Sequence, residues 1–83
     1  MNDPSASTAF PTVDARGLNW PLPLLKLKKL LAPRPGQGGY GLLATDADTE
    51  NDIRRLAARE GYTLRLARED DGSLRFELTA QRA

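Results

Sequence analysis

The chain has 83 residues, which is enough for one small domain but not for two. It contains no cysteine and no histidine, which excludes disulfide bonds, thiolate metal sites and the commonest general base near neutral pH. Twelve basic and eleven acidic residues leave a net charge of +1, so no overall positive charge indicates a nucleic-acid-binding protein.

The first residues lack the features of a targeting signal. Residues 1–9 have neither the positive segment nor the apolar segment of a signal peptide. No apolar run approaches the ~20 residues that are needed to cross a bilayer. We therefore expect a disordered lead-in over residues 1–9 and a single domain over residues 10–80. The protein is expected to be a cytoplasmic monomer that contacts no membrane.

A strand and a stiff helix entrance are predicted next. Phe10–Ala15 is a short candidate strand. Pro21 follows as the first residue of a helix, with Asn19 or Trp20 as its cap. Pro23 also falls in the first turn, whose N–H groups have no intrahelical partner. Both prolines therefore stiffen the entrance of the helix without breaking it.

The spacing of leucine and lysine residues gives this first helix two faces. The inner face consists of Leu24, Leu27 and Leu31, and the outer face of Leu22, Leu25, Lys26 and Lys29. Prolines and glycines between residues 33 and 41 end the helix and form a connection.

A central strand and a second helix follow this connection. Tyr40–Thr45 has an apolar core on both sides, as a central strand would have. The second helix begins at Thr49, with Asp52 in the place of the usual glutamate of a capping box, and it stops at Gly61. Its predicted buried stripe consists of Ile53, Leu56 and Ala57.

Two alternating segments complete the chain. Residues 63–68 and 73–78 alternate between apolar and charged residues, and Asp70-Asp71-Gly72 between them is typical of a hairpin turn. The predicted order is therefore β-α-β-α-β-β. Because the apolar stripes lie only on one side of each helix, we expect an α/β two-layer sandwich: a four-stranded mixed sheet with two helices on one face.

This element order, together with the sequence Asp-Ala-Arg-Gly-Leu-Asn-Trp-Pro-Leu-Pro at residues 14–23, resembles the TusA/SirA-like sulfur-carrier family. The resemblance runs from about Val13 to Leu78 and includes Lys28-Lys29, Leu43-Ala44-Thr45-Asp46 and Asp52-Ile53. It implies a small cytoplasmic protein that receives sulfur as a persulfide on a cysteine. The sulfur passes to a partner in tRNA thiolation, molybdenum-enzyme maturation or sulfur oxidation.

The family's cysteine precedes the first proline of this motif, and Trp20 occupies that position here. A thiol at a helix N-terminus has a lowered pKa because the helix dipole and the free N–H groups stabilise the thiolate. An indole forms no persulfide, so this chain cannot carry sulfur by the family's mechanism. Three interpretations of Trp20 follow: an interface anchor, a replacement of a carrier's cysteine, or an aromatic side chain folded over the core.

We predict a non-catalytic protein-interaction module in, or derived from, a sulfur-relay pathway, with a cysteine desulfurase or another relay component as its partner. The predicted contact centre consists of Trp20, Pro21, Leu22 and Pro23, with Lys26 and Lys29 as its basic rim. A lysine run on a helix is also typical of a solvated face. The alternatives are a sulfur carrier whose cysteine has been replaced, and an RNA-binding module suggested by fold analogy alone.

No enzyme, cofactor or metal site is predicted. Without cysteine, histidine or a convergent pair of carboxylates, no nucleophile and base can be assembled. Asp46 and Asp48 are expected to cap the second helix rather than bind a metal, because no further ligands converge on them. The near-neutral charge and the scarcity of exposed aromatic residues also argue against nucleic acid as a partner.

Overall fold

The computed structural model describes residues 10–33 and 38–81, and it contains the six predicted elements in the predicted order. They are β1 (Thr12–Ala15), α2 (Leu22–Leu31), β2 (Gly39–Ala44), α3 (Thr49–Glu60), β3 (Tyr62–Arg68) and β4 (Leu74–Ala80). The predicted disorder of residues 1–9 and part of the predicted connection, residues 34–37, lie outside the described residues.

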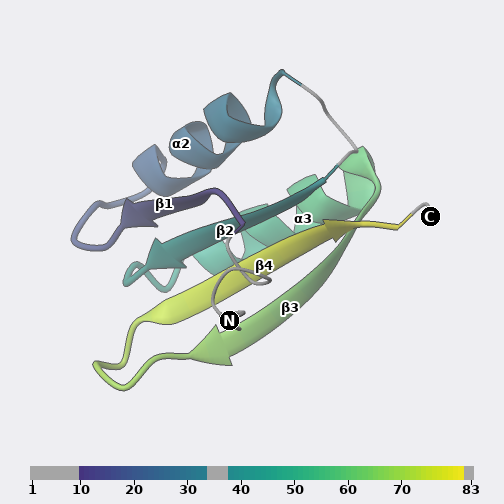
Figure 1. Cartoon of the computed structure of the whole chain (residues 1–83). Helices are drawn as coiled ribbons and strands as arrows, with labels where there is room; N and C mark the ends of the chain where they lie inside the picture. Colours follow the sequence, from purple (N-terminus) through teal and green to yellow (C-terminus); the bar gives the residue numbers. More distant parts are fainter. Residues whose placement is uncertain (1–9, 34–37, 82–83) are drawn as a thin grey trace.

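The four strands form one mixed sheet in the order β1-β2-β4-β3 (Figure 1). β1 runs parallel to β2, whereas β4 is antiparallel to both of its neighbours. A parallel pair requires a crossover connection, which α2 provides. Both helices cover one face of the sheet, which confirms the predicted two-layer sandwich. Since each helix follows a strand of the parallel pair, α2 and α3 both begin at the carboxyl edge of that pair.

The core lies between the helices and the sheet, where the predicted stripes meet. Leu27 and Ile53 are fully buried at the centres of the two helices, and Phe76 is fully buried on the sheet. The remaining buried apolar residues are Ala15, Leu31, Leu42, Ala44, Leu56, Ala57, Tyr62 and Leu78. Neither described helix is long and apolar enough to span a membrane.

The ends of α3 confirm one prediction and correct another. Gly61 ends the helix in the left-handed region, with φ of +85°, and its N–H donates to the carbonyl oxygen of Ala57. The predicted capping box is wrong. Thr49 is already helical, and its hydroxyl is buried without a hydrogen-bond partner among the described residues. Asp48 occupies the N-cap position without a side-chain capping bond.

Candidate functional site

The entrance of α2 is a turn that is fixed to the neighbouring loop. Gly17 has φ of +81°, and its N–H donates to the hydroxyl of Thr45, which follows β2, at 2.9 Å. The helix begins one residue later than the sequence predicts. Pro21 is its N-cap and Pro23 its second residue, where a missing N–H removes no helical hydrogen bond. The carbonyl oxygen of Pro21 accepts the N–H of Leu25 at 3.0 Å.

Trp20 stands immediately before this entrance, and two aspartates hold it there. Its backbone N–H donates to a carboxylate oxygen of Asp46, in the loop after β2. Its indole N–H donates to a carboxylate oxygen of Asp52, in the first turn of α3. The residue nevertheless remains 56% exposed, so Trp20 does not fold back over the core. The indole lies on the surface in a defined position.

Two leucines on the outer face of α2, close to Trp20 in the sequence, are also exposed. Leu22 is 47% exposed and Leu25 is 51% exposed, and their separation by three residues places them side by side on the helix. We call Trp20, Leu22 and Leu25 the Trp20 patch. Lys26 and Lys29, both exposed, follow it along the same face of the helix.

The predicted contact centre needs one correction. Pro23 is fully buried at the helix entrance, so its side chain is not available at the surface for a contact. Pro21 is half-buried. Of the predicted contact centre, Trp20 and Leu22 are therefore exposed, and Leu25 on the same outer face of the helix is exposed as well.

Asp46 and Asp48 also differ from their predicted roles. One carboxylate oxygen of Asp46 accepts the backbone N–H of Asp48 at 3.0 Å, and the other accepts the N–H of Trp20. Asp46 therefore links the loop after β2 to the entrance of α2 instead of capping α3. No group of three or more histidine, cysteine, aspartate or glutamate residues is placed to hold a metal ion within the described ranges.

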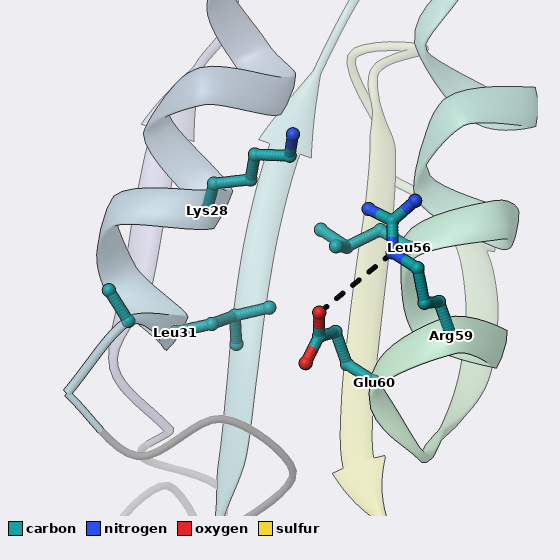
Figure 2. A pocket seen from close by; sticks show the side chains of 6 residues that line it. Lys28, Leu31, Leu56, Arg59 and Glu60 are labelled. Atoms are coloured by element: carbon teal, nitrogen blue, oxygen red, sulfur yellow. Dashed lines mark ion pairs between the residues drawn. The ribbon is translucent and has the colours of Figure 1, made fainter.

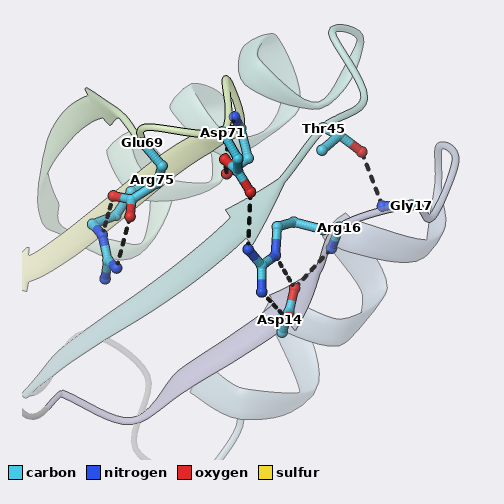
Figure 3. A network of polar contacts seen from close by, with 8 residues as sticks. Asp14, Arg16, Gly17, Thr45, Glu69, Asp71 and Arg75 are labelled. Atoms are coloured by element: carbon cyan, nitrogen blue, oxygen red, sulfur yellow. Dashed lines mark hydrogen bonds and ion pairs between the residues drawn. The ribbon is translucent and has the colours of Figure 1, made fainter.

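A charged network fixes the start of the same turn (Figure 3). The guanidinium group of Arg16 donates to both carboxylate oxygens of Asp14, at 2.8 and 2.7 Å, and to Asp71 of the β3–β4 hairpin at 3.1 Å. Hydrogen bonds from Arg16 lower the pKa of Asp14 to about 2. The hydrogen bond to Asp14 in turn raises the pKa of Arg16. The hairpin is braced further by Arg75, which donates to Glu69 at 2.7 Å.

Two shallow grooves flank α2. The groove between the two helices has a volume of about 230 Å³. Figure 2 shows that Lys28 of α2 reaches into this groove opposite Arg59 and Glu60 of α3. Leu31 and Leu56 line its apolar part. The second groove, about 280 Å³, lies on the outer side of α2 beside β1. Neither groove contains the Trp20 patch.

The fold and the helix entrance define a known class of small domain. A SirA-like protein from Desulfitobacterium hafniense has a crystal structure that matches this fold with a TM-score of 0.77 at 24% identity, covering 88% of this chain and 100% of that one. The model of the family described as "Sulfurtransferase TusA" matches residues 11–80. The chain belongs to the TusA family.

Curated relatives agree with this assignment. A candidate sulfur carrier protein of Neisseria meningitidis is 38% identical over 61 residues, which cover 74% of this chain and 82% of that protein. The sulfur carrier protein TusA of Allochromatium vinosum is 34% identical over 64 residues, which cover 77% of this chain and 84% of that protein. The resemblance seen in the sequence is therefore confirmed at the level of the family and the fold.

Proposed function

We propose that this chain is a non-catalytic TusA-family protein that docks onto a protein of a sulfur-relay pathway through the Trp20 patch. One observation carries the proposal. Trp20 occupies the position that the family resemblance assigns to the carrier cysteine, and it is held there with 56% of its surface exposed. Because the sequence contains no cysteine, the chain has no thiol on which a persulfide could form.

The proposed patch has the composition of an interface centre. Tryptophan is enriched among the residues that contribute most to protein binding, and large apolar side chains around it exclude water. Trp20, Leu22 and Leu25 are three of the four large apolar residues that are exposed in the described part of the chain. Such a cluster is a better candidate for recognition than singly scattered apolar residues.

The basic rim favours an acidic partner surface. Lys26 and Lys29 are exposed, and neither forms an ion pair with another described residue. Paired with carboxylates of a partner, these lysines would orient the encounter and raise its rate more than its affinity. A cysteine desulfurase, or a relay component that receives sulfur from it, is the proposed partner.

Binding of a purified cysteine desulfurase to the immobilised chain tests this proposal. Trp20→Ala should weaken binding at least about thirtyfold, as expected for a residue that contributes ~2 kcal/mol or more at an interface centre. Leu66→Ala is the matched control, since Leu66 is an exposed apolar residue on β3, outside the patch. Equal losses in the two variants, or no loss in either, would refute the docking role of Trp20.

Mass spectrometry after incubation with the desulfurase and free cysteine tests the chemistry. The unaltered chain should gain no sulfur atom. Trp20→Cys would place a thiol at the helix entrance, and sulfur loading of that variant alone would favour the alternative of a carrier whose cysteine has been replaced. Transfer of sulfur to the unaltered chain would contradict the non-catalytic role. Salt-sensitive retention of tRNA on a filter would instead support the RNA-binding alternative.

A further inference from the structure

β1 is an edge strand, and no other strand pairs with its outer side in the part of the chain that the structure describes. The N–H of Gly41 donates to the carbonyl oxygen of Pro11 at 2.8 Å. Since alternate residues pair in a parallel ladder, Pro11 and Val13 direct their backbone groups towards β2. Thr12 and Asp14 therefore direct their N–H and C=O groups outwards, as a template for a further strand.

The outer groove of α2 lies beside this open edge. Val13 and Leu30, both half-buried, form its apolar part, and Lys26 and Lys29 flank them. Side chains of a β-strand alternate between the two faces of the sheet. A strand added to β1 would therefore place every second side chain on the α2 side, over this groove.

The charges select the kind of strand that would fit. Lys26 and Lys29 have no carboxylate partner among the described residues, so they are available to acidic side chains. A second copy of the chain would bring its own two lysines to the same place, and like charges oppose that pairing. Lysines and short strands also protect sheet edges from aggregation, but that role requires no apolar groove between them.

We propose that the open edge of β1 binds an extended acidic segment of another protein by strand addition. In this arrangement an apolar side chain of the segment covers Val13 and Leu30, and carboxylates on either side of it pair with Lys26 and Lys29. Backbone hydrogen bonds to Thr12 supply affinity, and the groove supplies specificity. The inference does not depend on Trp20, Leu22 or Leu25, but it uses the two lysines that also form the basic rim of the Trp20 patch, so the two sites are neighbours that share Lys26 and Lys29.

A synthetic peptide, acetyl-Ser-Glu-Thr-Ile-Thr-Glu-Ser-amide, is the probe. Its glutamates and isoleucine fall on one face of a strand, and its pattern is the same in either chain direction. In an NMR titration, the amide signals of Thr12 and Asp14 should shift most. Lys26→Gln combined with Lys29→Gln should weaken binding about tenfold, as expected for the loss of two exposed ion pairs. Lys28→Gln, on the other side of the helix, should leave it unchanged.

Two altered peptides and one variant complete the test. A peptide N-methylated at its three central residues keeps its side chains but cannot donate these hydrogen bonds, and it should not bind. A peptide with lysines in place of glutamates should not bind either. Trp20→Ala should bind the acidic peptide normally, which separates this site from the Trp20 patch. Absence of binding at millimolar peptide, equal binding of the altered peptides, or shifts confined to Trp20 and Leu22 would overturn the proposal.

Discussion

Asp52 is expected to hold the indole of Trp20 in position, and Asp52→Ala tests this directly. The side chain of Asp52 is only 21% exposed, and it accepts the indole N–H as well as a guanidinium N–H of Arg55 at 3.2 Å. A hydrogen bond to a charged group contributes about 1.5–3 kcal/mol to the free energy of unfolding. Because the indole is half exposed to water, we expect the bond between Trp20 and Asp52 to contribute near the lower end of that range. An acidic residue in the first helical turn adds about 0.3–1 kcal/mol.

The expected loss for Asp52→Ala is therefore about 2 kcal/mol, or roughly 10 °C in Tm for a domain of this size. Glu50→Ala is the matched control. Glu50 lies in the same first turn and pairs with Arg54 at 2.7 Å, whereas the indole N–H of Trp20 donates to Asp52. Its removal should cost only about 0.5–1 kcal/mol. Urea unfolding followed by circular dichroism measures both variants.

A double-mutant cycle with Trp20→Phe isolates the indole bond, because phenylalanine keeps an aromatic ring and removes the N–H. The coupling free energy between Trp20 and Asp52 should be about 1 kcal/mol, whereas Trp20 and Glu50 should be additive. Increased acrylamide quenching of Trp20 fluorescence in Asp52→Ala would show the same release of the indole. Additivity of Trp20→Phe with Asp52→Ala, within ~0.3 kcal/mol, would refute the reasoning.

Further predictions concern the network, the core and the helix end. Arg16→Gln should raise the pKa of Asp14 from about 2 towards 3.8, as measured by NMR titration of the carboxyl carbon of Asp14. Because the pKa of Asp14 is lower in the folded chain than in the unfolded chain, the pairing of Asp14 with Arg16 stabilises the fold above pH 3.8. This stabilisation is lost as the pH falls towards 2. Leu27→Ala should cost about 2–5 kcal/mol of unfolding free energy, whereas Leu25→Ala on the exposed face should cost less than ~1 kcal/mol, both measured in urea. Gly61→Ala should cost about 1–2 kcal/mol in the same assay, because its φ of +85° strains any side chain.

The fold could be predicted because its signals are local. The helical spacing of Leu27 and Leu31 predicts α2 and its buried face. The apolar centre of residues 40–45 likewise predicts β2 as a buried strand. The same spacing predicted the outward direction of Leu22 and Leu25, and both are exposed in the structure. Alternation across the final hairpin predicted its two strands within two residues at each end.

The details of the helix entrance could not be predicted, because residues distant in the sequence determine them. Asp46 and Asp52 lie 26 and 32 residues beyond Trp20, and nothing local marks them as its acceptors. Arg16 likewise reaches Asp71 across 55 residues. The capping box at Thr49 failed for a related reason: the turn that begins at Asp46 brings Thr49 into the helix and under the surface.

The exposure of Trp20 was left open by the sequence, since an aromatic residue beside a proline is compatible with a buried or an exposed position. Its indole has a polar N–H on an apolar ring, and that N–H requires an acceptor when it is partly covered. Asp52 supplies the acceptor at the surface, so the ring is held there instead of entering the core. The role of this surface in contacting a partner stays a prediction.

Fluorine NMR of the chain labelled with fluorotryptophan tests that role most directly, because Trp20 is the only tryptophan and gives one signal. The free chain should show a resonance with a large solvent isotope shift, as an exposed indole does. Adding a cysteine desulfurase should shift and broaden this resonance and reduce its isotope shift. A resonance that stays unchanged while sedimentation shows the complex to have formed would contradict docking through the Trp20 patch.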